Sequence, residues 1–175
     1  MSWKVRVVLS LRVMLACAVV LLLPQCADKR QETSKEQELE AATGSNVEIL
    51  QSDSGETVTF DDGGRKTTIA SGKELAAPAN YPPHGFIPED AVIQSSASQG
   101  LSMIIVYSVP GALPNAFNRN REALRDRGWT EEDVVPLEGG SGYVSYQRGN
   151  ATLSEEFVTD DQGRVEVTQM YDSGN

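Results

Sequence analysis

Cysteine and histidine are nearly absent from this chain of 175 residues. Its two cysteines, Cys17 and Cys26, both lie in the first 26 positions. A chain cleaved before Cys26 keeps only that cysteine, so we exclude an internal disulfide, a thiol nucleophile and a cysteine-based metal site for it. An exported domain without disulfides has to depend on its packed core. The one histidine, His84, has neither a nucleophile nor an acid indicated beside it, which favours a solvated residue over a catalytic one.

Basic residues are also scarce once the first 27 positions are set aside. All 25 acidic residues come later, whereas Lys4, Arg6 and Arg12 come earlier, so the remainder has 12 basic residues and a net charge of −13. The phosphates of a nucleic acid require a concentrated positive surface, so we predict no nucleic-acid partner. Adsorption onto anionic lipid headgroups is disfavoured for the same reason, and membrane contact would have to come from acyl chains.

No apolar run is long enough for an ordinary membrane-spanning helix. The run 13–23 has 11 residues, against the ~20 that cross a bilayer. It follows a basic start and ends before a polar stretch, which is the layout of an export signal, so we predict a signal peptide over residues 1–25. Retention as an uncleaved anchor is an alternative, although a longer span would have to include Arg6 and Arg12 at a cost.

The end of this signal carries a candidate lipidation site. The stretch Leu23-Pro24-Gln25-Cys26 resembles the lipobox of bacterial lipoproteins, in which a leucine lies three residues before the modified cysteine. The resemblance implies lipidation of Cys26 and attachment to the membrane through this N-terminal lipid, with the chain facing the periplasm or the extracellular side. Gln25 stands where such signals carry a small residue, so cleavage without lipidation is an alternative. We interpret Cys17 as an ordinary apolar residue of the signal.

Beyond the signal, composition divides the chain into four segments. Residues 26–45 are highly charged, with Leu39 as their one large apolar residue, and predict a flexible tether or a frayed helix. Residues 46–76 predict a short β meander that must pack on the next domain or remain marginal. Residues 77–87 form a proline-rich linker, whose Tyr81, Phe86 and Ile87 we expect to cover the following domain.

Residues 88–172 predict an α+β domain. Two strands are expected near 91–96 and 101–109, then a helix that starts beside Pro114 and is capped by Gly128. Three more strands are expected near 143–148, 151–158 and 164–171. The order ββαβββ predicts an antiparallel sheet with one packed helix.

This domain also resembles a loose group of uncharacterised bacterial exported lipoproteins. The residues that carry the likeness are Pro82-Pro83, Ile87-Pro88, Ala91 and the helix end Arg127-Gly128-Trp129. The resemblance implies an architecture and a location in the cell envelope, and it implies no activity.

Candidate chemistry is sparse. The acidic clusters at 131–133, 155–156 and 160–161 lack the alternating ligands and turn glycine of a calcium loop, so we interpret them as solvated and predict no metal and no cofactor. Arg121 and Arg125, one helical turn apart, form a candidate contact for an anionic partner. Alternatively, Glu122, Asp126 or the cluster 131–133 neutralises them within the chain.

With no catalytic residues identified, the leading hypothesis is a non-enzymatic, lipid-anchored module that binds an envelope protein or helps to maintain the envelope. An exported hydrolase that acts on cell-wall glycan through carboxylates is the alternative, and it predicts a buried acidic pair with a raised pKa in a cleft. A third hypothesis, ligand binding on the sheet face away from the helix, requires exposed aromatics there; Tyr143 and Tyr146 are predicted to point to opposite faces, so only one can serve.

Overall fold

A computed structural model describes residues 29–160 and 162–174 of the chain. The predicted signal peptide and Cys26 lie outside the described residues. Thr33–Asn175 form one compact unit, to which the following account applies. Its described residues contain an antiparallel sheet and two helices, so the predicted α+β class is confirmed. Among them, we find no helix with the length and apolar content needed to cross a membrane.

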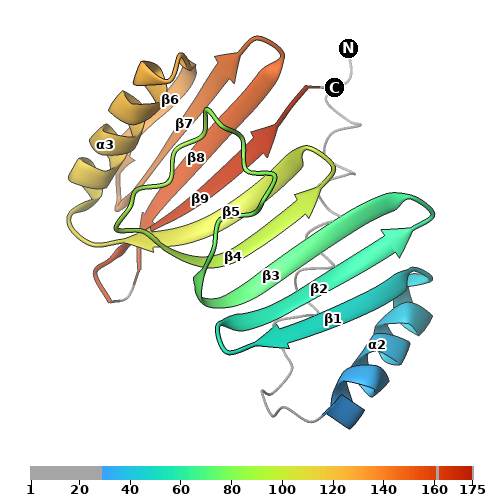
Figure 1. The fold of residues 1–175 in the computed structure, drawn as a ribbon. Coiled ribbons are helices and arrows are strands. Elements are labelled where there is room, and N and C mark those ends of the chain that lie inside the picture. The colour runs from blue at the N-terminus through green and yellow to red at the C-terminus, as the bar shows by residue number, and fades with distance from the viewer. Residues whose placement is uncertain (1–28, 161, 175) are drawn as a thin grey trace. The chain divides into compact units, whose positions relative to one another are not determined.

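The nine described strands form one antiparallel sheet in the order β1-β2-β3-β4-β5-β9-β8-β7-β6. The strand bounds are β1 Asn46–Ser52, β2 Gly55–Asp62, β3 Arg65–Leu75, β4 Val92–Gln99, β5 Ser102–Val109, β6 Thr130–Glu138, β7 Ser141–Arg148, β8 Ala151–Thr159 and β9 Val165–Asp172. Figure 1 shows the C-terminal strand β9 inserted between β5 and β8. The N-terminal meander joins the rest through pairing of residues 67–71 with 95–99, which confirms that it packs on the following domain.

The predicted strand order needs one correction, because four strands and not three follow the helix α3, Leu113–Asp126. The missed strand is β6, at the edge of the sheet. After Thr130 it carries three consecutive acidic residues at 131–133, it contains Pro136, and it shifts register twice against β7. Bulges and proline are typical of edge strands, and together they remove the alternation that identifies a strand in a sequence.

Of the two predicted alternatives for residues 26–45, a flexible tether or a helix, the structure shows a helix over its described part, α2, Lys29–Thr43. Helicity here comes from contacts with the meander and not from an apolar stripe. Leu39 packs against a small buried cluster of Val47, Ile49 and Val58. The helix is followed by Gly44, whose φ of 71° is the left-handed conformation that glycine adopts readily after a helix.

The predicted features of helix α3 are confirmed. Pro114 lies in its first turn, where its missing N–H would have had no helical partner. At its end, the Gly128 N–H donates to the Arg125 carbonyl at 2.9 Å and the Trp129 N–H to the Leu124 carbonyl at 3.1 Å. This is the Schellman arrangement, and it turns Trp129 back into the core, where its side chain is buried.

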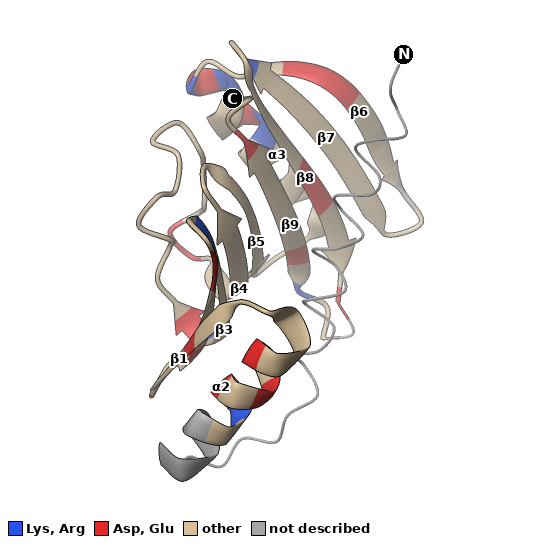
Figure 2. Cartoon of the chain, turned by 90° about the vertical axis from the view of Figure 1, so that its right-hand side faces the viewer, with Lys and Arg blue, Asp and Glu red and all other residues tan. Residues whose placement is uncertain are grey.

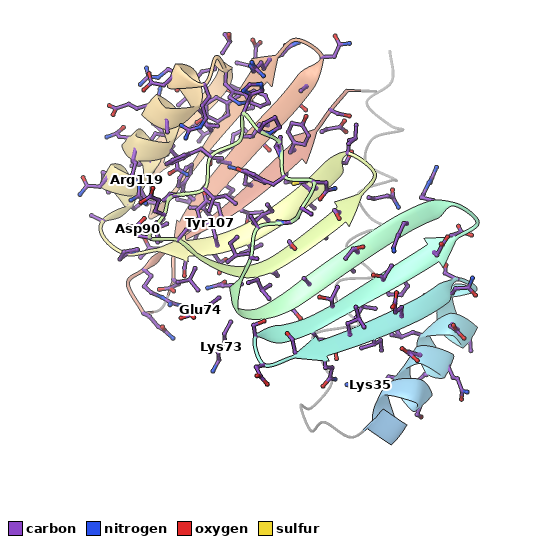
Figure 3. All side chains as sticks on the ribbon, in the orientation of Figure 1. Lys35, Lys73, Glu74, Asp90, Tyr107 and Arg119 are labelled. Atoms are coloured by element: carbon purple, nitrogen blue, oxygen red, sulfur yellow. The ribbon has the colours of Figure 1, made fainter. Side chains whose placement is uncertain are left out.

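The segment between β3 and β4, residues 76–91, crosses the sheet on the α3 side (Figure 1). As predicted, Tyr81, Phe86 and Ile87 pack against the main core. Two side-chain interactions also attach it to the helix region. Arg119 donates to both carboxylate oxygens of Asp90 at 3.0 and 3.1 Å (labelled in Figure 3), and the Trp129 indole donates to the backbone carbonyl of residue 84 at 2.7 Å.

The two helices contact opposite faces of the sheet, α3 over the main core and α2 through Leu39 beside the edge strand β1. The cross-strand register aligns Ile49, Val58, Ile69, Ala97 and Ile104 in one row, whereas the main core under α3 contains the next residue of β5, Ile105. Because adjacent residues of a strand point to opposite faces, the cluster under α2 and the core under α3 lie on different sides. Figure 2 shows α2 beside the β1 end of the sheet and α3 beside the other end.

Candidate functional site

The least expected side chain of the main core is the carboxylate of Glu155 in β8. Three inward positions of this strand are Leu153, Glu155 and Phe157, and Glu155 is 0 % exposed. Among the side chains that the structure describes, it is the only fully buried acidic one. A buried carboxylate is costly unless its oxygens accept hydrogen bonds, so its neighbours decide what it can do.

Four neutral donors from four different elements surround Glu155. Oε1 accepts from Asn120 Nδ2 of α3 at 2.9 Å, from Gln169 Nε2 of β9 at 3.0 Å, and from the Tyr107 hydroxyl of β5 at 3.3 Å. Oε2 accepts from the Tyr146 hydroxyl of β7 at 3.4 Å. Tyr107 is labelled in Figure 3. No cation is among these partners, so hydrogen bonds alone compensate the charge.

A second layer of hydrogen bonds extends this cluster to the segment 76–91. The Tyr81 hydroxyl donates to Gln169 Oε1 at 2.7 Å, and Gln169 Nε2 also donates to the Phe86 carbonyl at 3.0 Å. Asn120 Nδ2 donates in addition to the Tyr107 oxygen at 2.7 Å. The cluster therefore joins α3, the irregular segment and four adjacent strands through one carboxylate.

Burial dominates the electrostatics of the cluster. It raises the pKa of Glu155 from its ordinary value of 4.5 to about 7, because desolvation outweighs the opposing effect of the four hydrogen bonds. The pKa values of Tyr81, Tyr107 and Tyr146 are raised as well, first by burial and then by the charge of Glu155. The tyrosines therefore stay neutral donors, and Glu155 is the group of the cluster that titrates near neutrality.

A shallow hollow on the described surface does not reach this carboxylate. It measures about 50 Å³, and its lining includes Trp129, Arg148 and Tyr171 but not Glu155. Ligand pockets usually measure several hundred Å³. Glu155 does not line this hollow and is 0 % exposed, so the described surface gives it no contact with a substrate.

The two arginines that the sequence singled out lie together at one acidic residue. Arg121 donates from Nε and from a terminal nitrogen to Glu131 at 2.8 and 2.7 Å, and Arg125 Nε lies 3.9 Å from the same carboxylate. The hydrogen bond from Arg121 is the main cause that lowers the pKa of Glu131. The cluster 131–133 thus supplies the internal neutralisation that was one of the two predicted alternatives. Contact with an anionic partner stays a prediction, and the half-exposed Arg125 is the more accessible of the two.

Sequence reasoning missed Glu155, which it placed in a solvated acidic pair. That prediction is correct for the exposed Glu156 and wrong for Glu155. The strand alternation Leu153-x-Glu155-x-Phe157 was a usable signal, because it places the glutamate on the apolar face. For His84, the exposed side chain agrees with the predicted solvated residue. The described residues include no group of three or more metal-ligating side chains placed to hold an ion.

Comparisons with protein-family models, with curated proteins and with solved structures found no match to this chain.

Proposed function

We propose that this chain is a lipid-anchored bacterial envelope protein that acts by binding a partner and not by catalysis. The observation that carries the proposal is the enclosure of Glu155. The pKa of this carboxylate is raised toward neutrality, which suits proton transfer, yet its side chain is 0 % exposed. An active-site acid has to reach the proton that it transfers. We therefore assign the cluster the role of fastening α3 and residues 76–91 to the sheet.

The membrane anchor rests on the sequence. The basic start, the short apolar run and Leu23-Pro24-Gln25-Cys26 support export and lipidation, and the charge of −13 after residue 27 leaves acyl chains as the means of membrane contact. A single acyl chain binds membranes only marginally, so stable attachment would need more than one chain. The partner in this proposal is another envelope protein.

The raised pKa of Glu155 favours one alternative, a carboxylate-dependent hydrolase that acts on cell-wall glycan. Glycosidases of this kind place two carboxylates on either side of the scissile bond. No second buried acid accompanies Glu155 among the side chains that the structure describes. The third hypothesis, a ligand on the face away from α3, has Tyr143 as its available aromatic, because Tyr146 is buried in the core.

The binding proposal and the hydrolase are distinguished by incubating purified cell wall with the wild-type protein and with Glu155→Gln. We expect no release of soluble glycan fragments from either protein. Release by the wild type that is abolished in Glu155→Gln would refute the proposal and support the hydrolase. Glu156→Gln, which changes the exposed neighbour, is the matched control.

The anchor is tested by metabolic labelling with a fatty-acid analogue in a bacterial host. We expect labelling of the wild type and of Cys17→Ser, and loss of label in Cys26→Ser. Label that persists in Cys26→Ser, or that disappears in Cys17→Ser, would contradict the assignment of the lipid to Cys26.

A further inference from the structure

The strand β1 is one edge of the sheet, and no other strand of the described part of the chain pairs with its outward backbone groups. β1 pairs with β2 alone, with Ile49 opposite Val58. An uncovered edge is a template on which another extended chain can add by backbone hydrogen bonding. Folded proteins therefore protect such edges. In this chain, side chains of α2 protect the edge of β1.

Helix α2 supplies acceptors to this edge. The Val47 N–H donates to Glu40 Oε1 at 3.1 Å, and the Ile49 N–H donates to Glu36 Oε1 at 2.9 Å. The two spacings match, because carboxylates four residues apart share one face of a helix and N–H groups two residues apart point to one side of a strand. The side chains of α2 thus occupy the positions that the carbonyls of a neighbouring strand would take.

The remaining attachment of α2 to the sheet is slight. Among the described side chains of the helix, Leu39 is the one that packs on the small apolar cluster, and Lys35 (labelled in Figure 3) lies 3.7 Å from Glu56 of β2. Figure 2 shows that the rest of the described helix surface is mostly acidic or uncharged. Such a helix adds little stability of its own, so its two carboxylate contacts are a large part of what keeps it on the edge.

The opposite edge of the sheet is protected by its own strand. β6 carries acidic residues at 131–133, Pro136 and two register shifts, all of which hinder the addition of a strand. β1 has none of these beyond the exposed Glu48, and its register against β2 is unbroken. Removal of α2 would therefore bare a regular edge together with the apolar side chains of Val47 and Ile49.

We propose that the outer edge of β1 is a strand-pairing site, that α2 covers it, and that the occupant of the uncovered edge is β1 of a second copy of this chain. A two-fold axis between the Ile49 residues of two copies would pair their β1 strands antiparallel. In this register the outward N–H and C=O of Val47 in one copy face those of Gln51 in the other. The same register places Glu48 opposite Leu50, so like charges do not meet across the axis. Val47 and Ile49 of both copies then lie on one face and form a continuous apolar strip.

The test uses the full chain in mild detergent, so that any association through the apolar N-terminal run is common to all variants. Glu36→Ala/Glu40→Ala removes both acceptors, and alanine favours the helix, so the change acts on docking and not on helicity. At low protein concentration we expect exchange of the Val47 and Ile49 amides to accelerate about tenfold or more. At high concentration the two amides should become protected again and the protein mass should double. Unchanged protection in β5 and β9 shows that the fold is intact.

Two control variants distinguish the loss of the hydrogen-bond acceptors at the edge of β1 from the loss of negative charge on α2. Glu36→Gln/Glu40→Gln removes the same charge but keeps an oxygen acceptor, and Glu38→Ala changes an exposed acid of the same helix. Both should stay monomeric with slow exchange at Val47 and Ile49. The proposal is overturned if the alanine pair leaves exchange unchanged, if exchange is fast at every concentration with no dimer, or if either control associates as strongly as the alanine pair.

Discussion

The buried carboxylate of Glu155 predicts an unusual dependence of stability on pH. Its pKa is raised from 4.5 to about 7 in the folded chain, so between these values the folded state binds more protons than the unfolded state. The free energy of unfolding therefore falls as the pH rises through this window. The stability that the protonated Glu155 provides relative to the ionised form is fully present below about pH 4.5. It is lost progressively up to about pH 7 and changes little above that. At about 1.36 kcal/mol per pH unit, the difference amounts to about 3 kcal/mol.

Glu155→Gln should remove this dependence without leaving a buried group unpaired. The amide oxygen can keep the hydrogen bonds from Asn120, Gln169 and Tyr107, and the amide nitrogen faces the Tyr146 hydroxyl, which can accept. The variant should therefore approach the wild type in stability near pH 5 and exceed it by about 3 kcal/mol near pH 8.

Urea denaturation followed by circular dichroism at pH steps from 5 to 8 measures this difference. The other titratable groups are common to the two proteins, so their contributions to the pH dependence of unfolding cancel. The remaining difference is the effect of residue 155. Glu156→Gln on the same strand, with an exposed side chain, should follow the wild type at every pH. If the curves for the wild type and Glu155→Gln run parallel, the carboxylate is ionised throughout and the reasoning from burial is wrong.

Three further variants test the packing around the cluster. Leu124→Ala should lower the free energy of unfolding by about 2–5 kcal/mol in urea denaturation, because the side chain is 0 % exposed in the main core; a loss below about 1 kcal/mol would contradict this placement. Gly142→Ala should cost about 1–3 kcal/mol in the same assay, since its Cβ would lie 2.5 Å from Leu137 Cδ2; an unchanged midpoint would show that Leu137 moves away freely. Arg121→Ala should cost about 0.2–1 kcal/mol, with a smaller effect at high salt, and a double-mutant cycle with Glu131→Ala should account for most of it; zero coupling would show that the pair is not formed in solution.

The parts of the fold that the sequence predicted are those with local causes. Pro114 and Gly128 delimit α3 because their backbone preferences act within one or two turns, and the turns between adjacent strands follow from glycine and aspartate pairs such as those at 61–64. β5 was recognised because its residues are apolar on both faces, and such a strand belongs inside a sheet.

The edge elements were not predictable in this way. β6 and α2 are polar segments whose structure depends on a neighbour: β6 on its pairing with β7, and α2 on the outward N–H groups of β1. Composition correctly indicated that residues 26–45 lack an apolar core of their own. It contains no information on whether a folded edge elsewhere in the chain offers hydrogen bonds to their carboxylates.

By itself, then, the amino-acid sequence determined the α+β class, the helix α3 with its ends, most of the strands, and the export-type start with Cys26 as a predicted lipid site. Only the tertiary structure decided that β9 lies between β5 and β8, and that Glu155 meets Asn120, Tyr107, Tyr146 and Gln169 in the core. The physical reason is sequence distance. Alternation along β8 can put a carboxylate on the inner face, but the donors that make its burial tolerable come from residues up to 48 positions away, which only the folded chain brings together.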